Sequence, residues 1–493
     1  MDSGSCPGAA GPDPRCLLPW WDTGPFGRIC GLIRQGGGSV TEIFREIFRE
    51  YDIRGEVDRD LTEDGARAIG QAYGTAVRNR GLSRVSCARD GRTHSLRIQT
   101  ALMDGIRKTG CDVVDVGECP TPLLYFSLFH LGVDGGVQVT GSHNPPAFNG
   151  FKMCIGRSTI HGADIQALRE IIEAGSFATG AGRIESRDII QDYRAYMRGN
   201  IRISRRLTVV LDAGNGVGGL VAPQVFEDQG CRVIPLFCDV DGTFPNHHPD
   251  PTIPENLEIL RQTVLAQGAD VGMAFDGDAD RLGVVDEKGN ILYGDQLLMI
   301  FAREILRKNP GAAVIGEVKC SHVMYEDIAK RGGRPIMWKT GHSLIKQKMQ
   351  DEGALLAGEM SGHLFFADRY FGYDDGIYAA LRLAELLASS DAPLSSYLAH
   401  VPKTFSTPEI RRDCPDDIKF VIVEKAREWF RDRYEIIDVD GVRVLFPDGW
   451  GLIRASNTQP VLVLRFEAET PARLQEIRDL VEGRLDAIIR ETP

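Results

Sequence analysis

The chain has 493 residues, enough for roughly three to four domains of ordinary size. Its 57 basic and 69 acidic side chains give a net charge of −12 at pH 7, which argues against general binding to nucleic acid or to an acidic membrane surface. No apolar stretch approaches the length of a membrane span, so we expect no membrane partner either.

The 11 cysteines are scattered and contain no Cys-x-x-Cys pair. This spacing favours neither a zinc site nor a disulfide framework, and reduced thiols in a cytoplasmic protein are the simplest interpretation. Residues 1–40 are rich in Gly, Pro and Cys. We expect a disordered leader there, before the folded part of the chain.

The first predicted domain covers residues 41–187. A near-repeat of Glu-Ile-Phe-Arg leads into the sequence Tyr51-Asp-Ile-Arg54-Gly, which by itself is compatible with a simple turn. Helical and strand-like patterns then alternate, at 61–79, 85–88, 95–109, 112–116 and 135–139. This alternation predicts an α/β domain.

Residues 140–152, Thr-Gly-Ser-His-Asn-Pro-Pro-Ala-Phe-Asn-Gly-Phe-Lys, follow the last of these strands. Ser142 lies where a strand ends, which is where α/β sheets carry their sites. Two prolines stiffen the loop, and Gly141 and Gly150 permit positive φ on either side. We interpret Ser142 as an exposed nucleophile on a stiff turn, although a solvated surface turn is the simpler interpretation of this loop alone.

The second predicted domain, residues 188–290, opens with a strand and a glycine turn. Gly214, Gly216 and Gly219 fit the pattern G-x-G-x-x-G, and Asp239 or Asp241 stands near the distance expected of a ribose-binding acid. An NAD-binding oxidoreductase is therefore one alternative. The interpretation that we favour is a tight turn between a strand and a helix.

Three aspartates alternate in residues 276–281, Asp-Gly-Asp-Ala-Asp-Arg, between two strand-like runs. Carboxylates at this spacing direct three anionic oxygens at one spot, which is costly unless a hard cation neutralises them. The loop therefore predicts Mg²⁺ or Ca²⁺ at Asp276, Asp278 and Asp280. Arg281 is the only obvious internal cation.

The third predicted domain, residues 291–402, continues the alternation of helices and strands. Lys319 follows one strand, Thr340-Gly-His342 opens a helix, and Glu359-Met-Ser361-Gly-His363 follows another strand. Glu359 and Ser361 can each bond the vicinal hydroxyls of a pyranose ring. By itself, His342 is equally well explained as a helix-cap residue.

Residues 403–493 differ in composition and predict an α+β domain. Helical patterns cover 418–431 and 471–489, and strand-like runs lie at 442–446 and 461–467. Between the strands stands Arg454-Ala-Ser-Asn-Thr-Gln-Pro460. One guanidinium with the hydroxyl and amide donors of Ser456, Asn457 and Thr458 could cradle a phosphate, and a polar turn is the alternative.

Together these segments resemble the α-D-phosphohexomutase superfamily, in particular its bacterial phosphomannomutase/phosphoglucomutase type. The serine, carboxylate, glutamate and arginine segments occur in the family's order from about residue 42 to the end, with departures at Ala279 and Gln459. The resemblance implies an α/β fold of three similar α/β domains with mixed sheets plus a C-terminal α+β domain. It also implies an active site in the central cleft.

The resemblance further implies interconversion of hexose 1-phosphate and hexose 6-phosphate, of mannose and glucose, through a phosphorylated Ser142. Glucose or mannose 1,6-bisphosphate would be the intermediate and activator. Phosphoglucosamine mutases usually carry Gln where Met360 stands, and this activity is kept as an alternative. We expect a monomeric protein whose partners are small hexose phosphates.

The resemblance assigns roles residue by residue. Mg²⁺ would bind Ser142, Asp276, Asp278 and Asp280. The catalytic residues would be Ser142, His143, Lys152, Arg281 and His342, with Lys152 as proton acceptor or electrostatic partner. The substrate would contact Tyr51, Arg54, Lys319, Glu359, Ser361, His363, Arg454, Ser456, Asn457 and Thr458.

Overall fold

The computed structural model describes residues 30–34 and 40–492. The expected disordered leader, residues 1–40, falls largely outside the described residues. Where it is described it differs from that expectation, because β1 (Cys30–Arg34) pairs antiparallel with β2 (Val40–Phe44). The ladder gives partners to backbone N–H and C=O groups that the chain would otherwise leave to water.

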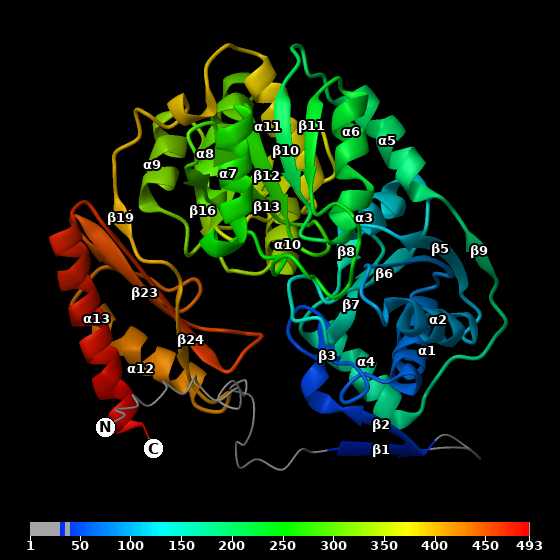
Figure 1. Cartoon of the computed structure of the whole chain (residues 1–493). Coiled ribbons are helices and arrows are strands. Elements are labelled where there is room, and N and C mark those ends of the chain that lie inside the picture. Colours follow the sequence, from blue (N-terminus) through cyan, green and yellow to red (C-terminus); the bar gives the residue numbers. More distant parts are fainter. Residues whose placement is uncertain (1–29, 35–39, 493) are drawn as a thin grey trace, which may run out of the picture.

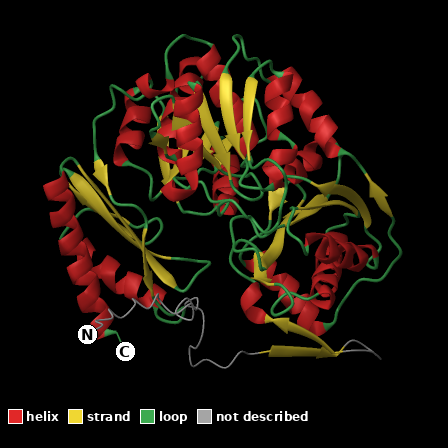
Figure 2. Ribbon diagram, in the orientation of Figure 1, coloured by secondary structure: helices red, strands yellow, loops and turns green. Residues whose placement is uncertain are grey.

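Three α/β domains and a C-terminal α+β domain make up the fold, as predicted (Figures 1 and 2). The first domain contains η1 (Arg45–Ile47), β3 (Ile53–Glu56), α1 (Glu63–Asn79), β4 (Arg84–Arg89), α2 (Ser95–Arg107), β5 (Asp112–Glu118), α3 (Thr121–His130), β6 (Gly135–Val139), β7 (Phe148–Ile155), β8 (Ser158–Thr159), α4 (Ala163–Ala174) and β9 (Ile184–Ser186). Its sheet has the order β3-β7-β6-β4-β5-β9, with β8 beside β7.

The second domain contains α5 (Ile189–Asn200), β10 (Thr208–Asp212), η2 (Val217–Leu220), α6 (Ala222–Asp228), β11 (Arg232–Leu236), η3 (Pro254–Leu257), α7 (Glu258–Gln267), β12 (Val271–Phe275), β13 (Leu282–Asp286) and β14 (Ile291–Leu292). The third contains α8 (Gly294–Lys308), β15 (Ala313–Glu317), α9 (His322–Lys330), β16 (Arg334–Trp338), α10 (His342–Glu352), β17 (Leu356–Gly358), β18 (Leu364–Phe366), α11 (Gly376–Ala388) and η4 (Leu394–Ser396). Their sheets have the orders β11-β10-β12-β13-β14 and β16-β15-β17-β18.

The three α/β sheets share one strand pattern. In each, a central strand (β4, β10 or β15) pairs in parallel with the next strand on one side and with a third strand on the other. The third strand (β6, β12 or β17) then pairs antiparallel with a fourth. The loop between the third and fourth strands therefore occupies the same place in every domain.

The C-terminal domain is an antiparallel sheet with helices, drawn in orange and red in Figure 1. It contains β19 (Phe405–Ser406), β20 (Ile410–Asp413), α12 (Lys419–Arg431), β21 (Ile436–Ile437), β22 (Val442–Phe446), β23 (Gly449–Ala455), β24 (Val461–Ala468) and α13 (Pro471–Glu491). Its core is separate, whereas one continuous apolar core runs through the other three domains. A small cluster of Val318, Trp450 and Leu452 joins it to the third domain.

Most predicted elements are present, but several helices have no counterpart among the predictions. The helix α3 is the clearest case: eight of its ten residues are buried, so it carries no apolar stripe of helical period for a sequence pattern to reveal. The strand β7 was also missed. It begins at Phe148, inside the stretch that was interpreted as a loop.

Candidate active site

Four segments bring the predicted site residues together. The serine loop (residues 140–147), the carboxylate loop (276–281) and the glutamate loop (359–363) each join the third and fourth strands of their own sheet. The arginine loop (454–460) leaves the end of β23 in the C-terminal domain. Direct contacts connect these loops, so residues from all four domains share one site.

Ser142 is buried, with 2% of its surface exposed, which corrects the prediction of an exposed serine. Its hydroxyl donates a hydrogen bond to Asp276 at 2.8 Å and lies 3.2 Å from Nδ1 of His143. Its backbone φ is +49°, a strained value for a residue with a side chain. In this conformation the hydroxyl of Ser142 points into the carboxylate loop of the neighbouring domain.

Arg92 holds this strained loop in place. Its guanidinium donates to the backbone carbonyls of Ser142 at 2.8 Å and Asn144 at 2.6 Å, and it also reaches the carbonyls of Pro145 and Phe148. Asp90 pairs with the guanidinium at 3.1 Å. One buried arginine thus satisfies three carbonyls of a turn that has no regular ladder of its own, and the carbonyl of Phe148 at the start of β7.

The sequence predicts that Gly141 and Gly150 serve this loop by permitting positive φ, and that reason is wrong. Gly141 and Gly150 do not adopt positive φ. A Cβ atom at Gly141 would lie 2.5 Å from the Arg92 guanidinium, and one at Gly150 would lie 2.2 Å from the carbonyl oxygen of Ile53. These glycines are required by close packing.

The carboxylates of Asp276, Asp278 and Asp280 are completely buried, and one oxygen of each lies within 4.8 Å of the others. Lys152 extends from β7 between them, donating to Asp278 at 2.7 Å and also to Asp280. Arg281 lies 4.0 Å from Asp276. Lys152 is therefore the principal internal cation, which corrects the expectation that Arg281 stands alone.

The charges of this cluster shift the pKa values in opposite directions. Burial raises the pKa of Asp276, and repulsion by Asp280 and Asp278 adds to it. Burial also disfavours the Asp278 carboxylate, but Lys152 outweighs it and lowers the pKa of Asp278. Burial opposes the Lys152 ammonium, but the aspartates outweigh it and raise its pKa. Burial lowers the pKa of His143 well below its usual value.

The donor set fits a hard divalent cation. The Oδ1 atoms of Asp278 and Asp280 are buried and have no hydrogen-bond partner among the described residues. The other oxygen of Asp278 accepts from Thr121 at 2.6 Å and from Lys152. Free carboxylate oxygens beside a serine hydroxyl are ligands that Mg²⁺ takes in proteins.

Two histidines and a further aspartate line the next part of the site. Arg281 donates through Nε to Nε2 of His363 at 3.0 Å, and Nδ1 of His363 lies 3.1 Å from Asp374. His342 lies 3.6 Å from the same carboxylate, and Lys346 pairs with it at 3.0 Å. Asp374 therefore contacts two of the predicted histidines, His342 and His363.

The glutamate loop lies over the start of α10. Glu359 accepts a hydrogen bond from the backbone N–H of Gly341 at 2.6 Å, and its second oxygen accepts from the Ser361 hydroxyl at 3.3 Å. Lys319 pairs at 3.0 Å with Glu409, which belongs to the C-terminal domain. The attraction of Lys319 lowers the pKa of Glu409 to about 2.

The arginine loop contacts the first and third domains. Arg454 pairs with Asp440 at 3.0 Å, and the same carboxylate accepts from the backbone N–H of Thr340. Asn457 donates to the hydroxyl of Tyr51 at 2.6 Å, and that hydroxyl donates to the carbonyl of Thr340 at 3.0 Å. Residues of three domains therefore meet at one residue, Thr340.

The remaining predicted substrate residues lie beside these contacts. Arg54 donates to the Asn144 side chain at 2.9 Å and so reaches the serine loop. The Ser456 hydroxyl accepts from the backbone N–H groups of Thr458 and Gln459, which closes the arginine loop into a turn. Arg454 itself is the sixth residue of the seven-residue strand β23, although the sequence placed it in a loop.

The glycine turn after β10 packs against the carboxylate loop. A Cβ atom at Gly216 would lie 2.7 Å from the carbonyl oxygen of Gly277, and one at Gly219 would lie 2.0 Å from that of Cys238. The backbone N–H of Val217 donates to Gly277. Close packing accounts for these two glycines and supports the interpretation as a tight turn.

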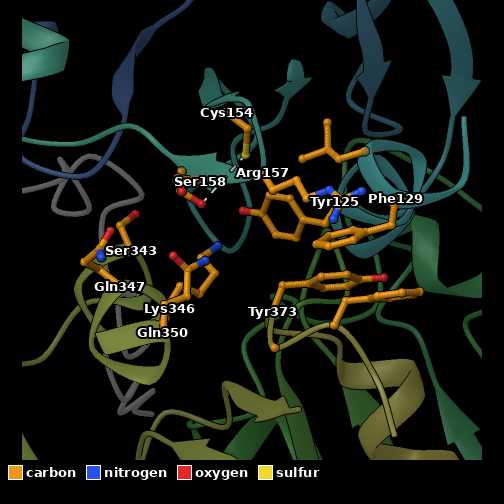
Figure 3. Close-up of a pocket in the computed structure, with 14 residues that line it drawn as sticks. Tyr125, Phe129, Cys154, Arg157, Ser158, Ser343, Lys346, Gln347, Gln350 and Tyr373 are labelled. Carbon is orange, nitrogen blue, oxygen red and sulfur yellow. Dashed lines mark hydrogen bonds between the residues drawn. The ribbon is translucent and has the colours of Figure 1, made fainter. Parts of the chain in front are cut away.

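A small cavity of about 30 Å³ lies between the first and third domains, and no residue of the four loops lines it (Figure 3). Tyr125, Phe129 and Arg157 of the first domain and Lys346 and Tyr373 of the third are among its lining residues. The Lys346 ammonium lies 4.1 Å from the centre of the Tyr125 ring. The cavity has room for ordered water and is too small for a sugar phosphate.

Sequence reasoning missed several residues that organise the site. Arg92, Thr121, Asp374, Glu409 and Asp440 act through contacts between segments far apart in the chain. Asp374 stands directly before the helix cap Asp375, and this neighbouring pair of acids is the one local signal that could have attracted attention.

Comparisons with known proteins agree with this architecture. The four domain models of the phosphoglucomutase/phosphomannomutase family match in order: α/β/α domain I at residues 45–179, domain II at 191–289, domain III at 293–405 and the C-terminal domain at 409–483. A phosphomannomutase/phosphoglucomutase of Pseudomonas aeruginosa is 49% identical, over 91% of this chain and 97% of the relative.

Two further relatives cover the chain as fully. A phosphoglucomutase of Neisseria meningitidis serogroup A is 46% identical, over 92% of this chain and 99% of the relative. The crystal structure of a phosphoglucomutase/phosphomannomutase family protein from Burkholderia thailandensis has a TM-score of 0.87 at 46% identity, covering 92% of this chain and 99% of that one. The chain belongs to the phosphoglucomutase/phosphomannomutase family. Among the described helices, none combines the length and the apolar character needed to cross a bilayer.

Proposed function

We propose that this protein interconverts the 1-phosphates and 6-phosphates of glucose and mannose through a phosphorylated Ser142. The observation that carries the proposal is the contact of the Ser142 hydroxyl with Asp276, 2.8 Å away, inside a cluster of three buried carboxylates and a lysine. Family membership and the names of the relatives support the same reaction.

The transfer proceeds in two balanced halves. The phosphoryl group of phospho-Ser142 passes to the free hydroxyl of a hexose monophosphate, so the bond from phosphorus to the serine oxygen breaks and a bond to the sugar oxygen forms. The sugar hydroxyl loses its proton to a base of the site, and the released Ser142 oxygen takes up a proton. The resulting 1,6-bisphosphate reorients, and the Ser142 hydroxyl gives up its proton as its oxygen bonds the other phosphorus. The bond from that phosphorus to the sugar oxygen breaks, and the sugar oxygen takes up a proton. Free 1,6-bisphosphate serves as activator.

Mg²⁺ is the cofactor that we propose, held by Asp276, Asp278, Asp280 and an oxygen of phospho-Ser142. When bound, the ion offsets the negative charge that gathers on the transferring phosphoryl group. Lys152 acts as an electrostatic partner in this proposal, because its ammonium donates to Asp278 and Asp280. Among the other residues of the site, His143 and His342 are the candidates for the base, and Arg281 stabilises charge.

The sugar and its second phosphate are assigned to the other loops. Glu359 and Ser361 hold hydroxyls of the ring, with His363 beside them. Arg454, Ser456, Asn457 and Thr458 hold the phosphate that does not react, and Lys319 adds a positive charge. Tyr51 and Arg54 complete the site from the first domain. A single phosphate site serves both orientations of the substrate.

A coupled assay with glucose 1-phosphate, mannose 1-phosphate and glucosamine 1-phosphate tests this assignment. We expect turnover of the first two that requires Mg²⁺ and is lost in EDTA. Preferred turnover of glucosamine 1-phosphate would favour the phosphoglucosamine mutase alternative, and no turnover of any of the three would refute the proposal. A cytoplasmic location is proposed from eight free thiols in the described chain, which a reducing compartment maintains.

A further inference from the structure

Glu317 is the last residue of β15, at the end of the central strand of the third domain, and it is completely buried. One of its carboxylate oxygens accepts from the backbone N–H of Lys319 at 2.8 Å and from the hydroxyl of Thr340 at 2.9 Å. The other oxygen accepts from the backbone N–H of Met360 at 3.3 Å. One carboxylate thus joins the three segments that follow the three parallel strands of this sheet.

Each of these segments carries residues assigned above to catalysis or to the substrate. The first carries Lys319, the second leads through Gly341 to His342, and the third is the glutamate loop with Glu359 and Ser361. Glu359 is itself bonded to the N–H of Gly341. The distance between Lys319 and Glu359 therefore depends on the Glu317 carboxylate, which bonds both of their segments.

The first domain has a comparable arrangement. Asp90 directly follows β4, the central strand of that sheet. Its carboxylate accepts from the backbone N–H of Arg92, two residues later, at 3.1 Å, and from the N–H of Gly141 in the serine loop at 3.0 Å. Glu317 likewise bonds the N–H two residues later and an N–H of the loop after the third strand. The same device recurs in two domains of one strand pattern, each time beneath a functional loop.

Thr340 extends the connection to the other domains. Its carbonyl accepts from Tyr51 of the first domain, and its N–H donates to Asp440, the partner of Arg454 in the C-terminal domain. Its hydroxyl is the group that Glu317 holds. Glu317 thus holds the residue that contacts both the first domain and the C-terminal domain.

We propose that Glu317 is a positioning residue for the hexose phosphate, setting the spacing of Lys319, Glu359 and the Thr340 junction without touching the substrate. The inference rests on the proposed function. Glu317→Gln is the informative change, because it keeps the size of the side chain and turns one acceptor into a donor. Whichever end carries the NH₂ group then faces a donor, and at least one of the three segments loses its anchor.

The experiment compares kinetics with thermal stability. We expect Glu317→Gln to raise KM for glucose 1-phosphate and glucose 6-phosphate about tenfold each, with a smaller change in kcat. Thr340→Val removes only one of the three bonds and should raise both KM values about threefold. If Glu317→Gln does not fold, the KM values of Thr340→Val test the proposal in its place. Phosphorylation of Ser142, measured by intact mass, should persist in both variants.

Met349→Ala is the matched control, since Met349 lies on α10 in the apolar core of the same domain and is not one of the residues that Glu317 bonds. It should lower Tm while KM stays within twofold of the wild type. Unchanged KM in both Glu317→Gln and Thr340→Val would overturn the proposal, and so would KM changes in all three variants that merely follow the loss of Tm. Wild-type protein without mutase activity would instead refute the proposed function.

Discussion

The ammonium of Lys152 donates a hydrogen bond to the carboxylate of Asp278 at 2.7 Å, although 126 positions separate them in the chain. The lysine comes from β7 of the first domain, and the aspartate lies in the carboxylate loop of the second. Because the same ammonium also bonds Asp280, two of the three carboxylates share one positive charge. The interface between the two domains therefore includes groups of the reaction site.

Replacing this lysine should make stability depend on the metal. Lys152→Met leaves three buried carboxylates without their main cation, and removing one partner of such a set costs about 3–5 kcal/mol. We expect that loss in the free energy of unfolding, measured in denaturant with EDTA, and a substantial recovery in Mg²⁺. Lys319→Met is the control, because its partner Glu409 lies outside the carboxylate loop. If Mg²⁺ restored the free energy of unfolding equally in the two variants, the assignment of the metal to the carboxylate loop would be contradicted.

Ser142 should be the residue that carries the phosphoryl group. Intact-mass measurement is expected to find a singly phosphorylated form of the wild type that Ser142→Ala lacks. Turnover should fall by several orders of magnitude, because the residue that donates the phosphoryl group in the first half-reaction and accepts it in the second is gone. The variant should retain the thermal unfolding of the wild type to within a few degrees. Wild-type turnover by Ser142→Ala would exclude the phosphoserine mechanism.

Arg454 should act on substrate use and leave phosphorylation intact. Loss of a charge-assisted, water-excluded contact to phosphate in Arg454→Ala is expected to cost about 2–4 kcal/mol in kcat/KM, mainly through a higher KM. Steady-state kinetics and intact mass measure the two effects. Arg478→Ala on α13 is a matched change at a distant arginine, and its kinetics should equal those of the wild type. Wild-type kinetics in Arg454→Ala would show that other residues bind the phosphate that does not react.

Discrimination between glucose and mannose should be weak. The two sugars differ only at C2, and a carboxylate that accepts from vicinal ring hydroxyls common to both cannot tell them apart. Where no buried group is left unpaired by inversion, little free energy separates the epimers. We expect kcat/KM values within about tenfold, or about 1.4 kcal/mol, and a parallel loss of both in Glu359→Ala. A thousandfold preference would reveal a further residue that contacts C2.

The pairing of Glu409 with Lys319 should contribute to stability in a defined pH range. The attraction of Lys319 lowers the pKa of Glu409 from 4.5 to about 2 in the folded protein. Its contribution, about 3 kcal/mol, is therefore fully present above pH 4.5 and is lost as the pH falls toward 2.

Denaturant unfolding of the wild type and Glu409→Gln between pH 6 and pH 3 measures this contribution. The difference in the free energy of unfolding between the two proteins should shrink as the pH falls, because protonated glutamate and glutamine are then both neutral. A difference that stays constant over this range would show that the pair does not titrate as expected.

The sequence by itself determined the local parts of this protein. Alternating periodicities predicted most of the α/β elements, since a half-buried helix and a buried strand each leave a regular pattern. Short motifs predicted the chemistry of single loops, such as the alternating carboxylates of residues 276–281. Where burial is uniform, as in α3, the pattern vanishes and the element was missed.

Only the tertiary structure decided which groups meet. Lys152 pairs with the carboxylate loop because β7 of the first domain brings it against that loop of the second domain, and Arg92 supports Ser142 across 50 positions of sequence. The tertiary structure also decided that Ser142 is buried. Ser142 has a positive φ, whereas Gly141 does not. Such contacts depend on how the domains pack against one another, and single side-chain contacts between domains leave no periodic pattern in the sequence. The residues that position the site, Asp90 and Glu317 among them, become visible only there.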